Sequence, residues 1–347
     1  GEVTLVMPAY DADPARLAMI VTATGAARAI IVDDASPRAV APIDGTEVMR
    51  LDANAGPGAA RQHGLDHVST EFVAFVDADV TVPPGWLDGL LPHFADPVVA
   101  LVAPRVRAAD GHRALERFDA VRSPLDLGPA PARVRAGSRV SYVPAAALVC
   151  RVEALRSVDG FDGAMRVGED VDLVWRLDEA GWRCRYEPMV EVLHDVRPHL
   201  GAWLRQRFGY GTSATELARR HPGAAVPAQL SAWSASAWAL PMVGAPLAGL
   251  AVAAGSTVAL VAKLPEMPDG GRGREALRLA GLGHLHAGRI LASAATRAWW
   301  PIALVLALTS RRARRALLLA ALVPSLAEWW KVRHRIDPTL YVAHASS

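Results

Sequence analysis

The chain contains little cysteine and almost no lysine. Cys150 and Cys184 are the two cysteines among its 347 residues, and their separation fits no metal-binding spacing. We expect both to be buried thiols of a protein in a reducing compartment, and not metal ligands. Lysine occurs only as Lys263 and Lys331, so arginine carries nearly all of the positive charge, a bias typical of a GC-rich genome.

The chain also lacks a large net charge. The formal net charge of +2 leaves no dense basic face for the phosphates of a nucleic acid, which argues against nucleic acid as a partner. The charge is unevenly spread, because residues 1–229 have 24 Lys+Arg against 30 Asp+Glu and residues 230–347 have 13 against 5. We therefore predict a soluble domain over 1–229, a membrane-associated segment over 230–335 and a tail over 336–347.

Formal charge is absent from a run of 41 residues, 222–262, rich in Ala, Leu, Val and Gly. About 20 apolar residues cross a bilayer as a helix, so a spanning helix fits at 238–262. A buried hairpin of a soluble fold is the alternative. The next apolar stretch, 282–310, is a poorer span because two arginines interrupt it.

The RRARR cluster at 311–315 follows this stretch and precedes another apolar piece at 316–327. Two spans would return the chain to its starting side and leave the cluster there. That arrangement obeys the positive-inside rule if the first domain is cytoplasmic, so we predict a cell-membrane protein with a cytoplasmic first domain. Helices that lie in the membrane interface are the alternative.

Three short apolar runs alternate with helical patterns in the first 80 residues. They are Val3–Met7, Ala29–Val32 and Phe72–Val76, with helical patterns at 15–27 and 58–68. This alternation predicts an α/β fold with a mostly parallel sheet covered on both faces. Because the first run starts at once and no signal peptide precedes it, we also expect the natural protein to have a further N-terminal region.

Polar clusters follow all three runs, as PAYD (8–11), DDAS (33–36) and DAD (77–79). Ligands of parallel sheets bind beyond the carboxyl ends of the strands, so we expect a site there. A D-x-D triplet alone is a weak signal, because acidic residues end many strands. Two carboxylates on one turn are nevertheless suitable ligands for Mg²⁺ or Mn²⁺ bridging to substrate phosphates.

Further polar residues lie on later elements. Further strands are expected at 140–149, 183–186 and 190–193. Glu169 and Asp170 open a helical pattern that runs to residue 180. Carboxylates there can cap the helix, or Asp170 can act as a general base.

Two more candidates carry positive or titratable groups. His194 ends the last run, where a lone histidine is more often structural than a ligand. NAGPGAAR (54–61) lacks the GK[ST] of a phosphate loop, so its glycines more plausibly form a turn that brings Arg61 toward an acidic or phosphate-bearing ligand.

Together these pieces resemble the family 2 glycosyltransferases, whose α/β fold (GT-A) binds nucleotide-diphospho-sugars. The resemblance covers about residues 2–215 and rests on VMPAYDA, VDDAS, NAGPGAAR, VDADV, GFDGAMRVGEDVDLVWRLDEAGW and VLHD, in this order. It implies a metal-dependent transfer of a hexose from a UDP-sugar to an acceptor hydroxyl, with inversion at the anomeric carbon.

The resemblance also implies a role for each matching residue at the nucleotide. Pro8 and Tyr10 would flank the base, and Asp34 would contact it. Arg61 would lie near the uracil or the phosphates, and Asp77 near the ribose or the donor sugar.

At the reacting end, the resemblance implies that Asp79 coordinates Mg²⁺ or Mn²⁺ beneath the diphosphate and that His194 completes the metal shell. Asp170 would be the catalytic base. Family members often have Asn where this chain has Gln62, so a contact specific to Asn is not carried over.

Two longer stretches resemble a narrower group, the glycosyltransferases of mycofactocin biosynthesis. They are YVPAAALVCRVEALRSVDGFD (142–162) and FGYGTSATELARRHPG (208–223), followed by the hydrophobic segments. This implies UDP-glucose as donor, a peptide-derived redox cofactor as acceptor and membrane association. Other bacterial family 2 enzymes share much of the pattern, so a lipid or polysaccharide acceptor is the alternative.

Two other classes of protein compete with a transferase. A sugar nucleotidyltransferase would have a Gly-rich basic loop after the first strand, where this chain has PAYDADP. An inactive membrane scaffold would have lost Asp79 or Asp170, and both are present.

Overall fold

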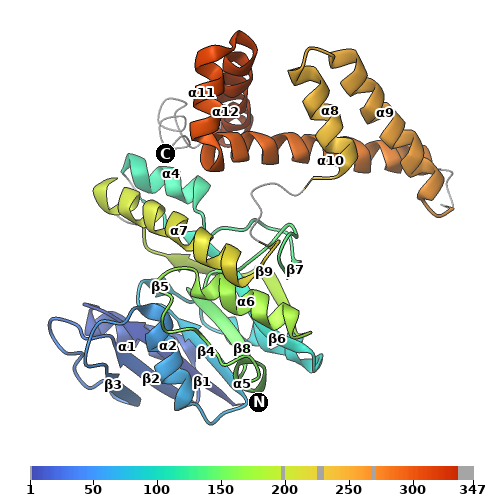
Figure 1. Ribbon diagram of the computed structural model, residues 1–347. Coiled ribbons are helices and arrows are strands. Elements are labelled where there is room, and N and C mark those ends of the chain that lie inside the picture. Colours follow the sequence, from blue (N-terminus) through green and yellow to red (C-terminus); the bar gives the residue numbers. More distant parts are fainter. Residues whose placement is uncertain (1, 112, 197–199, 225–229, 267–270, 335–347) are drawn as a thin grey trace. The chain divides into compact units, whose positions relative to one another are not determined.

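A computed structural model of the chain describes residues 2–111, 113–196, 200–224, 230–266 and 271–334 (Figure 1). The chain forms two compact units, Gly1–Ala225 and Val226–Ser347. The predicted domain boundary at 229/230 and the predicted tail at 336–347 lie outside the described residues.

The first unit contains a nine-stranded sheet and the helices that cover it. Its strands are β1 (Val3–Ala9), β2 (Arg28–Asp33), β3 (Thr46–Arg50), β4 (Phe72–Val76), β5 (Val80–Thr81), β6 (Val99–Ala108), β7 (Ala132–Val134), β8 (Ala147–Arg151) and β9 (Arg183–His194). Its helices are α1 (Pro14–Thr24), α2 (Pro57–Asp66), α3 (Trp86–Leu90), η1 (Leu91–Ala95), α4 (Ala114–Arg122), α5 (Val152–Arg156), α6 (Glu169–Glu179) and α7 (Leu200–Arg220).

The strand order is β3-β2-β1-β4-β8-β6-β9-β5, with β7 paired to β9. Strands β1 to β4 are parallel to one another, as the sequence predicts for strands joined by helices. Beyond β4 the sheet is mixed, because β8 runs antiparallel to both β4 and β6 whereas β9 is parallel to β6. The predicted α/β fold is thus confirmed, and its parallel part carries the polar strand ends.

Later strands differ from expectation in their bounds. The strand predicted over 140–149 begins only at Ala147, after a loop. The two short strands predicted over 183–186 and 190–193 form one strand, β9, which shifts register against β6 after Pro104 and so continues through a bulge.

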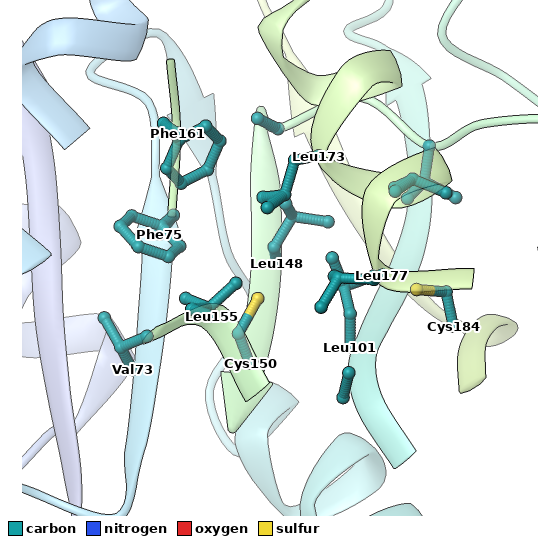
Figure 2. Close-up of a cluster of buried hydrophobic side chains, with 14 of the residues drawn as sticks. Val73, Phe75, Leu101, Leu148, Cys150, Leu155, Phe161, Leu173, Leu177 and Cys184 are labelled. Carbon is teal, nitrogen blue, oxygen red and sulfur yellow. The ribbon is translucent and has the colours of Figure 1, made fainter. Parts of the chain in front are cut away.

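Apolar side chains of the central strands alternate between two cores. Val6 and Phe75 point to the face covered by α2 and α6, whereas Leu5 and Ala74 point to the face covered by α1 and α3. Figure 2 shows part of the first core, in which the rings of Phe75 and Phe161 meet edge to face at 5.1 Å. Because both faces are buried, β4 is apolar along its whole length and β1 is apolar except at Thr4, whose hydroxyl is hydrogen-bonded to that of Thr70.

Both cysteines lie in this first core as fully buried free thiols, as predicted (Figure 2). Cys150 on β8 and Cys184 on β9 are each in register with Leu101 of the intervening strand β6. Two strand spacings of about 4.8 Å therefore separate them, which is too far for a disulfide.

The second unit is helical among its described residues. Its helices are α8 (Ala232–Met242), α9 (Pro246–Lys263), α10 (Arg272–Ser293), η2 (Ala294–Ala298), α11 (Trp300–Thr309) and α12 (Arg311–Val332). Within the unit, the His284 ring bridges the hydroxyl groups of Ser234 on α8 and Ser256 on α9, at 3.0 and 2.8 Å. This polar contact links α10 to α8 and α9, two helices that are otherwise mostly apolar.

The apolar stretches of the second unit are divided differently from the predicted spans. The stretch at 238–262 belongs to two helices, because the chain turns at Gly244 and restarts at Pro246. Of the described helices, α9 alone is long and apolar enough to cross a membrane. The stretch at 282–310 bends by 93° between α10–η2 and α11, so it would count only as a broken span.

The packing of α2 on the sheet gives a test of this fold. A Cβ at Gly64 would lie 2.4 Å from Val6 Cγ1, so Gly64→Ala should lower the free energy of unfolding by about 1–3 kcal/mol through overpacking. The matched control is Gly211→Ala on α7, where nothing lies within 4 Å of the new Cβ. The control should raise stability by up to about 1 kcal/mol, because alanine favours a helix. Urea unfolding measures both, and equal effects of the two changes would contradict the packing of α2.

Candidate active site

The loops after β1 and β2 form one rigid edge of the site. Asp11 and Ala35 have left-handed backbones, with φ of 49° and 54°, which is strained for residues other than glycine. The Ser36 hydroxyl accepts a hydrogen bond from the Asp11 backbone N–H at 3.0 Å and thus ties the two loops together. Tyr10 is 56% exposed beside this edge, whereas Pro8 is buried within β1. Of these two residues, Tyr10 is therefore the one whose ring is accessible to a ligand.

The two aspartates that end β2 hold the neighbouring backbone. Asp33 accepts bonds from the N–H groups of Ser36 and Val40 and pairs with Arg50. Burial raises the pKa of Asp33, but these hydrogen bonds outweigh it and leave the pKa below its usual value.

Asp34 organises the NAGPG loop in a similar way. Its two carboxylate oxygens accept the N–H groups of Ala55 and Gly56 at 2.7 and 2.9 Å. Asp34 therefore fixes the turn that leads into α2, and its role toward a nucleotide base stays a prediction.

Arg61 lies at the centre of the site. Its side chain is 3% exposed, and its two terminal nitrogens donate to Asp77 Oδ1 at 2.5 Å and to Glu169 Oε1 at 2.8 Å. These partners come from the end of β4 and the start of α6, so the guanidinium joins the two acidic motifs. Its positive charge balances part of a cluster of carboxylates that could not otherwise be buried together.

The carboxylates around Arg61 have raised pKa values. Burial is the main cause for Asp77, Glu169 and Asp170, and the charge of Arg61 opposes it at each of them. Glu169 reaches a pKa of about 7, because the neighbouring Asp170 adds to the effect of burial. A carboxylate with a raised pKa is a better proton acceptor near neutral pH.

The α6 helix positions Asp170. Gly168 precedes the helix with φ of 85°, a conformation suited to glycine, and the chain then enters the first turn. Asp170 Oδ1 accepts the N–H of Val171, and Oδ2 accepts the N–H of Ala145 from the loop before β8. The carboxylate is thus held between the helix and that loop, which Trp175 also binds through its indole N–H at Ser141 O.

Asp79 and His194 meet at the other side of the DAD turn. Val80 pairs with His194 where β5 lies beside β9, and this brings Asp79 Oδ2 within 3.4 Å of His194 Nε2. A carboxylate and an imidazole are suitable ligands for Mn²⁺ and, for the carboxylate, Mg²⁺. Asp77 is turned instead toward Arg61.

The donor set therefore fits a divalent ion held partly by the protein. Among the residues that the structure describes, no group of three or more His, Cys, Asp or Glu side chains is arranged so that it could hold a metal ion by itself. Magnesium sites in nucleotide-binding enzymes commonly use one or two carboxylates together with substrate phosphates, which agrees with two protein ligands here.

The metal end of the site is also tied to α1. Arg16 forms an ion pair with Asp195, and the Asp195 backbone N–H donates to the carbonyl of Asp79 at 3.0 Å. This pairing fixes the residue that follows His194 against the DAD turn.

Several residues of the site were not singled out in the sequence. The sequence indicates Glu169 only together with Asp170, and it does not single out Asp172 or His221. For Asp172, the available signal in the sequence is its place three residues before Trp175 in an amphipathic helical pattern, where the structure buries it. Gln62 accepts the backbone N–H of Phe161 at 2.7 Å, so the residue that replaces the family's Asn holds the GFDG turn.

Comparisons with known proteins show the family to which the chain belongs. The family "Glycosyl transferase family 2" matches residues 4–153. The pre-mycofactocin glycosyltransferase of Mycobacterium tuberculosis is 43% identical over 97% of this chain and 73% of its own length. This chain is a family 2 glycosyltransferase.

Other relatives of the glycosyltransferase are more distant. The N-acetylglucosaminyl-diphospho-decaprenol L-rhamnosyltransferase of M. tuberculosis is 30% identical over 52% of this chain and 64% of its own length. Among solved structures, the S. aureus TarS fragment 1–349 has a TM-score of 0.46 at 15% identity, covering 65% of this chain and 67% of the fragment. GalNAc-T7 with UDP, GalNAc and Mn²⁺ has a TM-score of 0.44 at 14% identity, covering 56% and 43%. At such scores these structures say nothing about the site.

The raised pKa of Glu169 gives the glycosyltransferase a specific pH dependence. A carboxyl group with a pKa of about 7 when folded and about 4.3 when unfolded binds more protons in the folded state, so stability falls as pH rises between these values. Glu169→Gln removes this titration. Between pH 5 and pH 7.5, the free energy of unfolding of the variant should fall by about 2 kcal/mol less than that of the parent.

Urea unfolding at several pH values measures this difference. Glu153→Gln, at an exposed position on α5, is the matched control and should keep the slope of the parent. An unchanged slope in Glu169→Gln would show that Glu169 does not titrate in this range.

Proposed function

We propose that this glycosyltransferase transfers glucose from UDP-glucose to an acceptor hydroxyl, in one displacement with inversion at the anomeric carbon. The observation that carries the proposal is the arrangement around Arg61. Arg61 binds Asp77, which belongs to the same turn as Asp79, and the Asp79–His194 pair would serve the donor. Asp170 is held separately, by backbone N–H groups of α6 and of the loop before β8. A donor site and a general base that do not share ligands are what a direct displacement requires.

The donor would lie along the carboxyl ends of β1, β2 and β4. The exposed Tyr10 ring is available to stack on the base. Asp77, which pairs with Arg61, would lie near the ribose or the sugar. Asp79 and His194 would hold Mg²⁺ or Mn²⁺, which when bound supplies positive charge opposite the diphosphate.

Asp170 would remove the proton from the acceptor hydroxyl as its oxygen attacks. The bonds from Val171 and Ala145 aim the carboxylate, and its raised pKa increases its basicity. General-base assistance of this kind contributes about 10²–10⁴-fold to the rate.

We further propose that the acceptor is a peptide-derived redox-cofactor precursor of the mycofactocin type. Support comes from the 43% identity to the pre-mycofactocin glycosyltransferase over 97% of the chain, against 30% over 52% for the decaprenol-linked rhamnosyltransferase. A lipid acceptor is the competing candidate.

A membrane location with the first unit on the cytoplasmic side is also part of the proposal. The second unit exposes large apolar side chains on every long helix, and tryptophans lie near the ends of α8, α11 and α12. Residues 230–347 also have a clear excess of arginine and lysine over acidic residues, which favours anionic lipid.

Removing the proposed base should separate chemistry from binding. Asp170→Asn should lower UDP release from UDP-glucose by at least about 100-fold, because the amide cannot accept the proton. Affinity for UDP in the presence of Mn²⁺ should stay within about twofold of the parent. Release at the parent rate would show that another group is the base.

Asp79→Ala is the complementary variant in the same assay. It should weaken binding of UDP in Mn²⁺ and should lower the dependence of that binding on Mn²⁺. If the parent protein bound UDP equally well with and without Mn²⁺, the metal part of the proposal would be wrong.

Fractionation of cells tests the location. The full chain should pellet with membranes, resist extraction by high salt and dissolve in mild detergent, because apolar contact with lipid is not screened by salt. Release by salt alone would indicate binding through arginine charge only, and recovery in the soluble fraction would contradict the membrane location.

A further inference from the structure

A buried histidine outside the donor site holds the helix that carries Asp170. His221 follows α7, and its ring is 2% exposed. Nε2 lies 3.0 Å from Asp172 Oδ1, and Nδ1 lies 2.8 Å from Glu179 Oε1. Ionised carboxylates only accept hydrogen bonds, so the ring satisfies both partners when both of its nitrogens carry protons.

The two partners of His221 lie on different turns of α6. Asp172 is in the first turn of α6, and Glu179 is the last residue of the helix. The His221 ring therefore bonds to both ends of α6. The Trp175 ring lies between them and meets the imidazole edge to face at 5.2 Å. Arg176 uses the second oxygen of Asp172, at 2.7 Å. The Asp172 carboxylate is therefore fully engaged and has one orientation.

The same end of α7 also holds the segment before α6. Arg220 pairs with Asp162 of the GFDG turn. Gly168 packs so closely on α7 that a Cβ there would lie 2.8 Å from Ser213 Cβ and 3.4 Å from the Leu217 side chain. Both the entry to α6 and its first turn are thus seated on α7.

We propose that His221, with the C-terminal turn of α7, is a positioning residue for Asp170. Asp170 lies two residues before Asp172 in the same helical turn, so fixing Asp172 fixes the backbone from which the Asp170 carboxylate projects. Displacing a catalytic group by about 1 Å can cost about 100-fold in rate. The inference rests on the proposed role of Asp170 as the base.

The α7 helix would thus support the catalytic helix α6 although it follows the whole sheet in the sequence. The helix follows the last strand of the sheet, and the first unit ends soon after it, at Ala225. His221 therefore anchors the end of α7 to α6 close to the end of the first unit.

The test compares kcat with donor affinity. His221→Leu removes both ring contacts and keeps an apolar side chain against Trp175, whereas His221→Gln keeps one amide donor. The control is Arg219→Ala on the same helix, whose side chain is 76% exposed. The full chain in detergent is assayed for UDP release from UDP-glucose with water as acceptor, and UDP affinity is measured in Mn²⁺.

We expect His221→Leu to lower kcat about 10- to 100-fold with UDP affinity within about twofold, because the ring bonds to Asp172 and Glu179 of α6, the helix that carries the proposed base. His221→Gln should keep more activity than His221→Leu, and Arg219→Ala should match the parent. Parent-like kcat in His221→Leu would overturn the inference. So would an equal loss of kcat and of UDP affinity, since that indicates general loosening of the unit.

Two further variants, Glu179→Gln and Asp170→Asn, are measured in the same assay. If His221→Leu does not fold, Glu179→Gln weakens one of the two ring contacts at a half-exposed position, and the same split between kcat and affinity is required of it. Asp170→Asn is measured alongside. If Asp170→Asn retains activity, the assignment of the base fails, whereas unchanged activity in His221→Leu with an inactive Asp170→Asn contradicts only the positioning role.

Discussion

The ion pairs of Arg61 are the interaction on which the site depends. The guanidinium is buried and binds one carboxylate from the end of β4 and one from the start of α6, two segments that are distant in the sequence. Without its charge, the acidic residues gathered at the strand ends would repel one another in a region from which water is largely excluded. The resemblance to the family suggested that Arg61 faces the nucleotide. In the structure its terminal nitrogens are occupied by Asp77 and Glu169, so its first task is to hold the two halves of the site together.

The strands that carry the site were predictable because their pattern is local. An apolar run that ends in a polar cluster marks β1, β2 and β4, and the structure places these three next to one another as expected. The pairing of Asp79 with His194 was not predictable from spacing, because it depends on β5, a strand of two residues with no pattern of its own. The family resemblance, and not the residues alone, supplied that pair. Contacts such as His221 with Asp172 join residues 49 positions apart and leave no periodic trace.

The second unit shows a different limit of sequence reasoning. Apolar composition identified the right region, because helices α8, α9 and α11 all lie within the stretches singled out. Composition did not reveal where the helices break, since the turn at Gly244 and the bend of 93° before α11 both fall inside the apolar stretches. The local signals were Gly244 and Pro246 at the first break and Pro301 at the start of α11. Counting apolar runs therefore overstates the length of the straight helices in this region and understates their number.

The burial of the two cysteines has a practical consequence. Both thiols lie in the first unit, and residues 230–347 contain no cysteine. Burial raises the pKa of Cys184 to about 12 and holds that of Cys150 well above its usual value, so neither forms the reactive thiolate while the core is closed. Alkylation of these thiols therefore requires the sheet around β8 and β9 to open. The rate at which these thiols are alkylated therefore reports how often the first unit opens. The helices of the second unit do not contribute to it, because they contain no cysteine.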